Sequence, residues 1–211
     1  MLATIEAYEA QLSEDPASLF PACCPACLEA GTLRVHELRP RGFWCCLLNQ
    51  VERVASTVLR VACRVCDSRT TVLPAFALPH KRYVASDLID ASQRYLLDDE
   101  ATHESATKVE GRPVFHSTMG ATRARSTVHR WITFLGSLTT ILGNGTELAK
   151  EADVTFSPLA EMLHVSKRRY RTDARCEVLG RAHLLLRVRS RLARALKYEI
   201  FPTVATREVW R

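Results

Sequence analysis

The sequence lacks any apolar run near the length of a membrane span, and its first residues do not form a signal peptide. It also lacks paired carboxylates, a nucleophile beside a base, and a glycine-rich phosphate loop, which are the usual signs of a catalytic site. These absences predict a cytoplasmic protein that neither spans a membrane nor acts as an enzyme.

The composition predicts a globular protein in a reducing compartment. The 211 residues are 47% hydrophobic, which allows one ordinary domain plus a small module, or two small domains. Eight cysteines without a signal peptide favour metal binding over disulfide bonds, because cytosolic thiols stay reduced.

Four of these cysteines form two Cys-x-x-Cys pairs, Cys24 with Cys27 and Cys63 with Cys66. Each tight turn presents two sulfurs on the same side, and four thiolates suit one tetrahedral Zn²⁺. The spacing therefore predicts one structural zinc ion in a zinc ribbon.

Other interpretations of the cysteines remain open. The four could be reduced core residues, since free cysteine packs as a small hydrophobe. Cys23 could replace Cys24 as a ligand if the turn shifts by one residue. Cys45 and Cys46 lie in an apolar segment, where core packing is expected.

Strand patterns fill the interval between the pairs. We expect two or three antiparallel strands within 32–38, 42–48 and 54–62, with turns at 39–42 and 49–50. The proline-punctuated connector 67–83 should lie on the ribbon through Leu73, Phe76 and Leu78.

The remaining segments are mostly helical, which gives an α+β fold. A helix with Ile5, Tyr8 and Leu12 on one face ends at Asp15-Pro16. Further helices are expected from Ser86 to about 98, near 102–110, after Ser157-Pro158 and over 177–198. A helix is also expected over 124–138, and Asn144-Gly145 should end or kink it. The expected regions are 1–20 (arm), 21–83 (ribbon and connector), 84–142 (helix-turn-helix-like domain) and 143–211 (basic helical region).

Charge is distributed unevenly along the chain. Residues 1–100 carry a formal charge of −3 and residues 101–211 carry +9, and the stretch 165–197 alone carries +9. Such a concentration favours a polyanion partner, with nucleic acid first. An arginine-rich solvated helix face is the alternative.

The helix over 124–138 is the candidate recognition helix. Its apolar residues recur at helical spacing, with Ser126 as the expected N-cap and a helix before it as the expected support. Its other face offers cations and hydroxyls for bases and phosphates. The candidate DNA-binding residues here are Arg123, Arg125, Ser126, Thr127, His129 and Arg130. An ordinary surface helix with a core tryptophan is the alternative.

A second set of candidate DNA contacts lies in the basic C-terminal region. Its apolar seam over 178–196 would be intrachain core or a dimer contact, and the arginines opposite could follow a phosphate backbone. A membrane-surface helix is disfavoured, because aromatic anchors are missing. The candidate residues are Lys167, Arg168, Arg169, Arg187, Arg191 and Arg194.

The order of these parts resembles short bacterial proteins associated with mobile elements, similar to the N-terminal part of insertion-sequence transposases. The resemblance covers roughly residues 20–140 and rests on Cys24-Pro-Ala-Cys27, Leu59–Cys66, Arg69–Tyr83 and Ser126–Ile132. It implies a zinc ribbon followed by helix-turn-helix. The loop 111–122 departs from that pattern, since such turns have three or four residues.

Together these observations predict a non-catalytic, zinc-dependent protein that binds double-stranded DNA. Its expected role is accessory to transposition or regulatory for a mobile element, alone or as a dimer through 178–196. The alternative is a protein-interaction module that docks on a transposase or another subunit.

Overall fold

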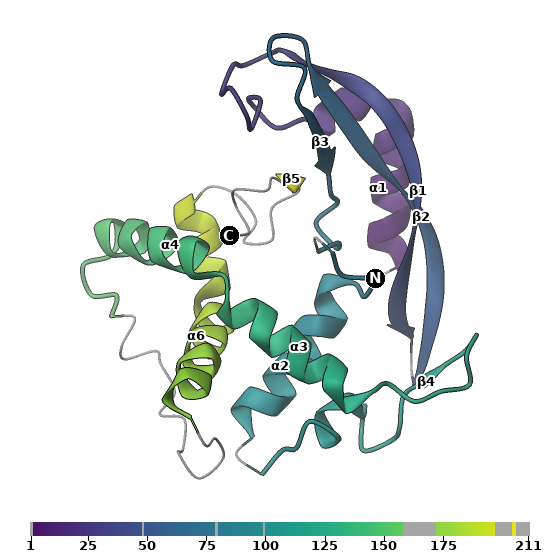
Figure 1. Ribbon diagram of the computed structural model, residues 1–211, viewed down its shortest axis with the longest axis vertical. Helices are drawn as coiled ribbons and strands as arrows, with labels where there is room; N and C mark the ends of the chain where they lie inside the picture. Colours follow the sequence, from purple (N-terminus) through teal and green to yellow (C-terminus); the bar gives the residue numbers. More distant parts are fainter. Residues whose placement is uncertain are drawn as a thin grey trace. The chain divides into compact units, whose positions relative to one another are not determined.

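The computed structural model describes residues 2–47, 49–78, 80–98, 100–157, 172–196 and 204–205. It has an α+β fold, as predicted, with helices and an antiparallel sheet (Figure 1). The chain forms two compact units. Of the described residues, unit 1 contains those within 2–45, 52–85 and 204–205, and unit 2 contains those within 46–51, 86–157 and 172–196.

The sheet of unit 1 has the strand order β1-β2-β3-β5, where β1 is Leu33–Leu47, β2 is Gln50–Cys63, β3 is Arg69–Val72 and β5 is Val204–Ala205. Strand β3 is antiparallel to both neighbours and pairs Val72 with Leu59 of β2. The first residues of β2, which belong to unit 2, pair in parallel with β4 (Phe115–His116).

The turn predicted at 39–42 was wrong, because β1 runs through Pro40 and Gly42 without interruption. Strand β1 lies at the edge of the sheet, where a proline need not donate to a second neighbour. Gly42 leaves room for the Arg53 side chain, whose Nη2 would lie 3.0 Å from a Cβ atom there. The connection near Asn49 was predicted correctly.

Helix α1 (Leu2–Glu14) buries Ile5, Tyr8 and Leu12 and ends before Asp15-Pro16, as predicted. The Tyr8 and Phe76 rings pack edge to face, with their centroids 5.7 Å apart. Phe76 packs in the same way on Phe43 of β1, with a centroid distance of 5.3 Å. The connector residues Leu73, Phe76 and Leu78 are buried, as predicted, and Phe76 packs on Phe43 of β1.

Unit 2 contains α2 (Ala85–Leu97), the short 3₁₀ helix η2 (Ser105–Thr107), α3 (Arg125–Gly136), α4 (Thr139–Ala152) and α6 (Asp173–Leu196). Both α3 and α4 pack chiefly on α6 (Figure 1). The apolar face of α3 is buried as predicted. The supporting helix α6 follows α3 in the chain, so the prediction of a preceding helix as its support was wrong. Residues 98–124 separate α2 from α3.

Two details of the helix boundaries differ from the predictions. Helix α3 begins at Arg125, with Ala124 in the N-cap position and no side-chain cap, so the N-cap assigned to Ser126 was wrong. The predicted break at Asn144-Gly145 was also wrong, because α4 passes through it and the chain bends at Ser137-Leu138. The helix expected after Ser157-Pro158 lies outside the described residues.

Gly136 explains why α3 and α6 can approach so closely. A Cβ atom at this position would lie 2.8 Å from Val178 Cγ1 and would overlap the Val178 carbonyl oxygen. On α6, Ala182, Leu185 and Val188 are buried, so the described part of the predicted seam belongs to the core of unit 2.

Candidate metal centre and the exposed face of helix α3

The two Cys-x-x-Cys turns have the same backbone hydrogen-bond pattern. In the first turn, Leu28 N donates to Cys24 O at 2.8 Å, and Cys24 N donates to Glu29 O at 2.9 Å. In the second, Asp67 N donates to Cys63 O at 3.1 Å, and Cys63 N donates to Ser68 O at 3.0 Å. The chain therefore forms two equivalent knuckles, although their sequences share little besides the cysteines.

The residue after each second cysteine has a positive φ angle, 63° at Leu28 and 53° at Asp67. This left-handed conformation closes the turn and is unusual for a side chain other than glycine. In each knuckle a backbone N–H group also points at the sulfur of the first cysteine: Ala26 N lies 3.4 Å from Cys24 Sγ, and Val65 N lies 3.4 Å from Cys63 Sγ. Such donors stabilise thiolates.

The four sulfur atoms of Cys24, Cys27, Cys63 and Cys66 all lie within 4.8 Å of one another. The Cys24–Cys66 and Cys27–Cys63 sulfur pairs are each 3.7 Å apart. A tetrahedron with metal–sulfur bonds of about 2.3 Å has edges of about 3.8 Å. These four side chains can therefore hold one metal ion.

Hydroxyl groups surround this cluster. Thr32 Oγ1 lies 3.3 Å from Cys63 Sγ, and Ser68 Oγ lies 3.3 Å from Cys24 Sγ and 3.0 Å from Cys66 Sγ. The hydrogen bond with Thr32, aided by the backbone at Cys66 and Val65, lowers the pKa of Cys63 to about 6. A lowered pKa favours the thiolate, which is the form that binds metal. At Cys27 a backbone hydrogen bond opposes burial and the three neighbouring sulfurs, which together raise the pKa of that thiol when no metal is bound.

The structure distinguishes Cys24 from Cys23 as the candidate ligand. Cys24, rather than Cys23, directs its sulfur to the cluster. The backbone of Cys23 pairs with that of Ala30 in an antiparallel β-bridge. Cys45 is buried in β1, as predicted. Cys46 is half-buried, and its backbone N–H donates to Asp87 Oδ2 at 2.6 Å.

The polar face of α3 is open to solvent. Four of the predicted DNA contacts, Arg125, Ser126, His129 and Arg130, are exposed, and Thr127 is half-buried. The helix has no acidic residue in its first turn. Burial and the neighbouring Arg175 and Arg130 cations lower the pKa of His129, so this imidazole stays neutral near pH 7.

Arg123 lies elsewhere. It is 4% exposed, and its guanidinium sits over the Trp131 ring at 5.6 Å from the centroid. This burial separates it from the exposed residues of α3 and makes it a packing residue of unit 2.

Arg175 was not among the predicted site residues, and α6 brings it to the side of α3. Its Nη1 donates to Thr133 Oγ1 at 2.7 Å. The only signal for it was its place within the basic stretch 165–197, since no local pattern links it to α3.

The C-terminal candidates are described only in part. Arg187 on α6 is exposed. Arg191 and Arg194 lie in α6, but their side chains are outside the described part of the structure, as are Lys167, Arg168 and Arg169 entirely.

Comparison of the chain with family models, curated proteins and solved structures gives no match. None of the helices in the described ranges is long and apolar enough to cross a lipid bilayer.

Proposed function

We propose that this chain is a zinc-dependent, non-catalytic protein that binds double-stranded DNA through the exposed face of α3. The observation that carries the DNA part of the proposal is that face itself. It exposes two arginines and a serine on a helix whose first turn contains no acid.

Zinc is the metal we propose for the sulfur cluster. Four thiolates in tetrahedral reach suit Zn²⁺, and a site with four protein ligands leaves no open position for chemistry. Residues 28–62 lie between the two knuckles, so a bound ion would fix both ends of this segment and stabilise unit 1.

A polyanion partner accounts for the charge placement on α3. The positive end of a helix dipole lies in its first turn, where Arg125 is otherwise poorly placed. A phosphate backbone at this end would offset that repulsion, and the dipole would then favour the same ligand as the arginines.

We further propose that α3 acts as the recognition helix of a helix-turn-helix-like unit, in which α6 supplies the support. The resemblance to mobile-element proteins suggests a role accessory to transposition or in transcriptional regulation. A transposase or a second copy of this chain would be the protein partner.

One observation favours the alternative of a protein-interaction module. Leu28 and Val65 lie on the two knuckles and are 74% and 65% exposed. An apolar partner surface at the knuckles would bind with little dependence on salt.

Fluorescence anisotropy with a labelled mixed-sequence duplex tests the proposal. Binding should weaken with salt, and Arg125→Ala and Arg130→Ala should each reduce the slope of log K against log salt by about 0.9 per lost phosphate contact. Arg112→Ala is the matched control, because Arg112 is exposed but lies outside α3. Equal slopes for all three variants and the wild type would refute the assignment to α3.

A further inference from the structure

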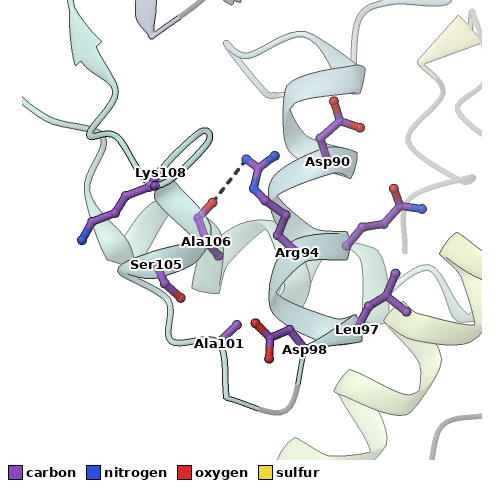
Figure 2. Close-up of a pocket in the computed structure, with 10 residues that line it drawn as sticks. Asp90, Arg94, Leu97, Asp98, Ala101, Ser105, Ala106 and Lys108 are labelled. Carbon is purple, nitrogen blue, oxygen red and sulfur yellow. Dashed lines mark hydrogen bonds between the residues drawn. The ribbon is translucent and has the colours of Figure 1, made fainter.

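Two adjoining cavities in unit 2 share Asp90 and Arg94 of α2. The larger, of about 640 Å³, is formed by α2 and residues 98–111 (Figure 2). The smaller, of about 240 Å³, also contains Arg123 and Asp87. Ligand pockets for small molecules have volumes of about 300–1,000 Å³, so the larger cavity is of a suitable size.

Arg94 is poorly satisfied for a half-buried cation. Its Nη2 donates to Ala106 O over a long 3.4 Å, as Figure 2 shows, and its Nε is buried without a hydrogen-bond partner. Among the described residues, no carboxylate oxygen lies within the 4.0 Å of an ion pair with this guanidinium.

The surroundings of Arg94 make its positive charge still less favourable. Burial, followed by repulsion from Arg123, lowers the pKa of Arg94, although Asp90 and Asp87 partly oppose the effect. A half-buried charge without a close counter-ion destabilises a fold. A guanidinium offers its donors in a planar fork that matches the oxygens of phosphate or carboxylate.

We propose that Arg94 is an oxyanion-binding residue and that the larger cavity takes a small phosphate ester. The Asp90 and Asp98 carboxylates also line this cavity (Figure 2). They accept hydrogen bonds from hydroxyl groups and repel a bare anion. A phosphate ester of a nucleoside or a polyol therefore suits the cavity better than inorganic phosphate.

This site is distinct from the proposed DNA contacts. Its lining comes from α2 and the segment that follows, whereas the exposed arginines proposed to contact DNA lie on α3. The inference therefore does not rest on DNA binding.

The test is titration of the full chain with inorganic phosphate and with adenosine monophosphate, followed by calorimetry and thermal unfolding. Arg94→Gln should weaken binding about ten- to a hundredfold, as expected for loss of hydrogen bonds to a charged group. Arg112→Gln is the control, because Arg112 is exposed and does not line the cavity, and it should bind as the wild type does.

Two further variants keep the test decisive if Arg94→Gln fails to fold. Arg94→Lys keeps the charge without the fork and should bind with intermediate affinity. Asp90→Asn removes a negative charge from the cavity and should tighten phosphate binding. Equal affinity in the Arg94 and Arg112 variants would overturn the proposal. So would the absence of binding by both small probes, even if a DNA duplex bound.

Discussion

Adding one methyl group at Gly136 should destabilise unit 2, because this glycine permits the contact between α3 and α6. In Gly136→Ala the new Cβ would overlap the Val178 carbonyl oxygen and lie 2.8 Å from Val178 Cγ1. The first of these is a backbone atom, so rotation of a side chain cannot relieve the overlap. One of the two helices would have to move.

The expected size of the effect follows from two opposing terms. Overpacking a well-packed core costs about 1–3 kcal/mol. Alanine favours a helix over glycine by about 1 kcal/mol in the interior, and by less at the last residue of α3. The net loss should therefore be about 1–2 kcal/mol.

Gly143 on α4 provides the matched control. It is exposed, and a Cβ there would meet nothing within 4 Å, so Gly143→Ala should stabilise the protein by up to about 1 kcal/mol. Urea unfolding followed by circular dichroism measures both variants. If Gly136→Ala is as stable as Gly143→Ala, the packing of α3 on α6 is wrong.

Three other predictions concern unit 1 and the junction of β1 with α2. Cys66→Ser should lose bound metal and lower the stability of unit 1, whereas the control Cys23→Ser should keep its metal. Elemental analysis measures the metal content, and equal contents in the two variants would contradict the ligand assignment. Glu9 accepts hydrogen bonds from Thr57 N at 2.7 Å and from the Ser56 hydroxyl, so Glu9→Ala should cost about 1–3 kcal/mol by urea unfolding, against little change for the exposed Glu6→Ala. Burial raises the pKa of Asp87 from 3.8 to about 6, so protonation is easier in the folded state than in the unfolded state. The stability that this group contributes is therefore complete below pH 4 and is lost as the pH rises through 6. The difference in unfolding free energy between the wild type and Asp87→Asn should change with pH in the same way. A difference that is independent of pH would be inconsistent with the raised pKa of Asp87.

Features set by neighbouring residues were predictable from the sequence. The Cys-x-x-Cys spacing forms a knuckle through local hydrogen bonds, so the positions of Cys24, Cys27, Cys63 and Cys66 were identified correctly. Helical spacing likewise identified the buried faces of α1 and α3, because the period of a helix is a local property.

Features set by distant contacts were not predictable. Pro40 indicated a turn, yet the edge position of β1 allows a strand there, and that position depends on the whole sheet. The burial of Arg123 against Trp131 and the support of α3 by α6 also depend on tertiary packing. A single sequence contains no direct signal for them.

The most direct test of the central claim is metal analysis of the purified full-length chain. Inductively coupled plasma mass spectrometry should find about one zinc ion per chain, and removing it with a chelator should unfold unit 1. Purified protein that is folded but contains no metal, and that does not take up zinc when it is supplied, would contradict the account.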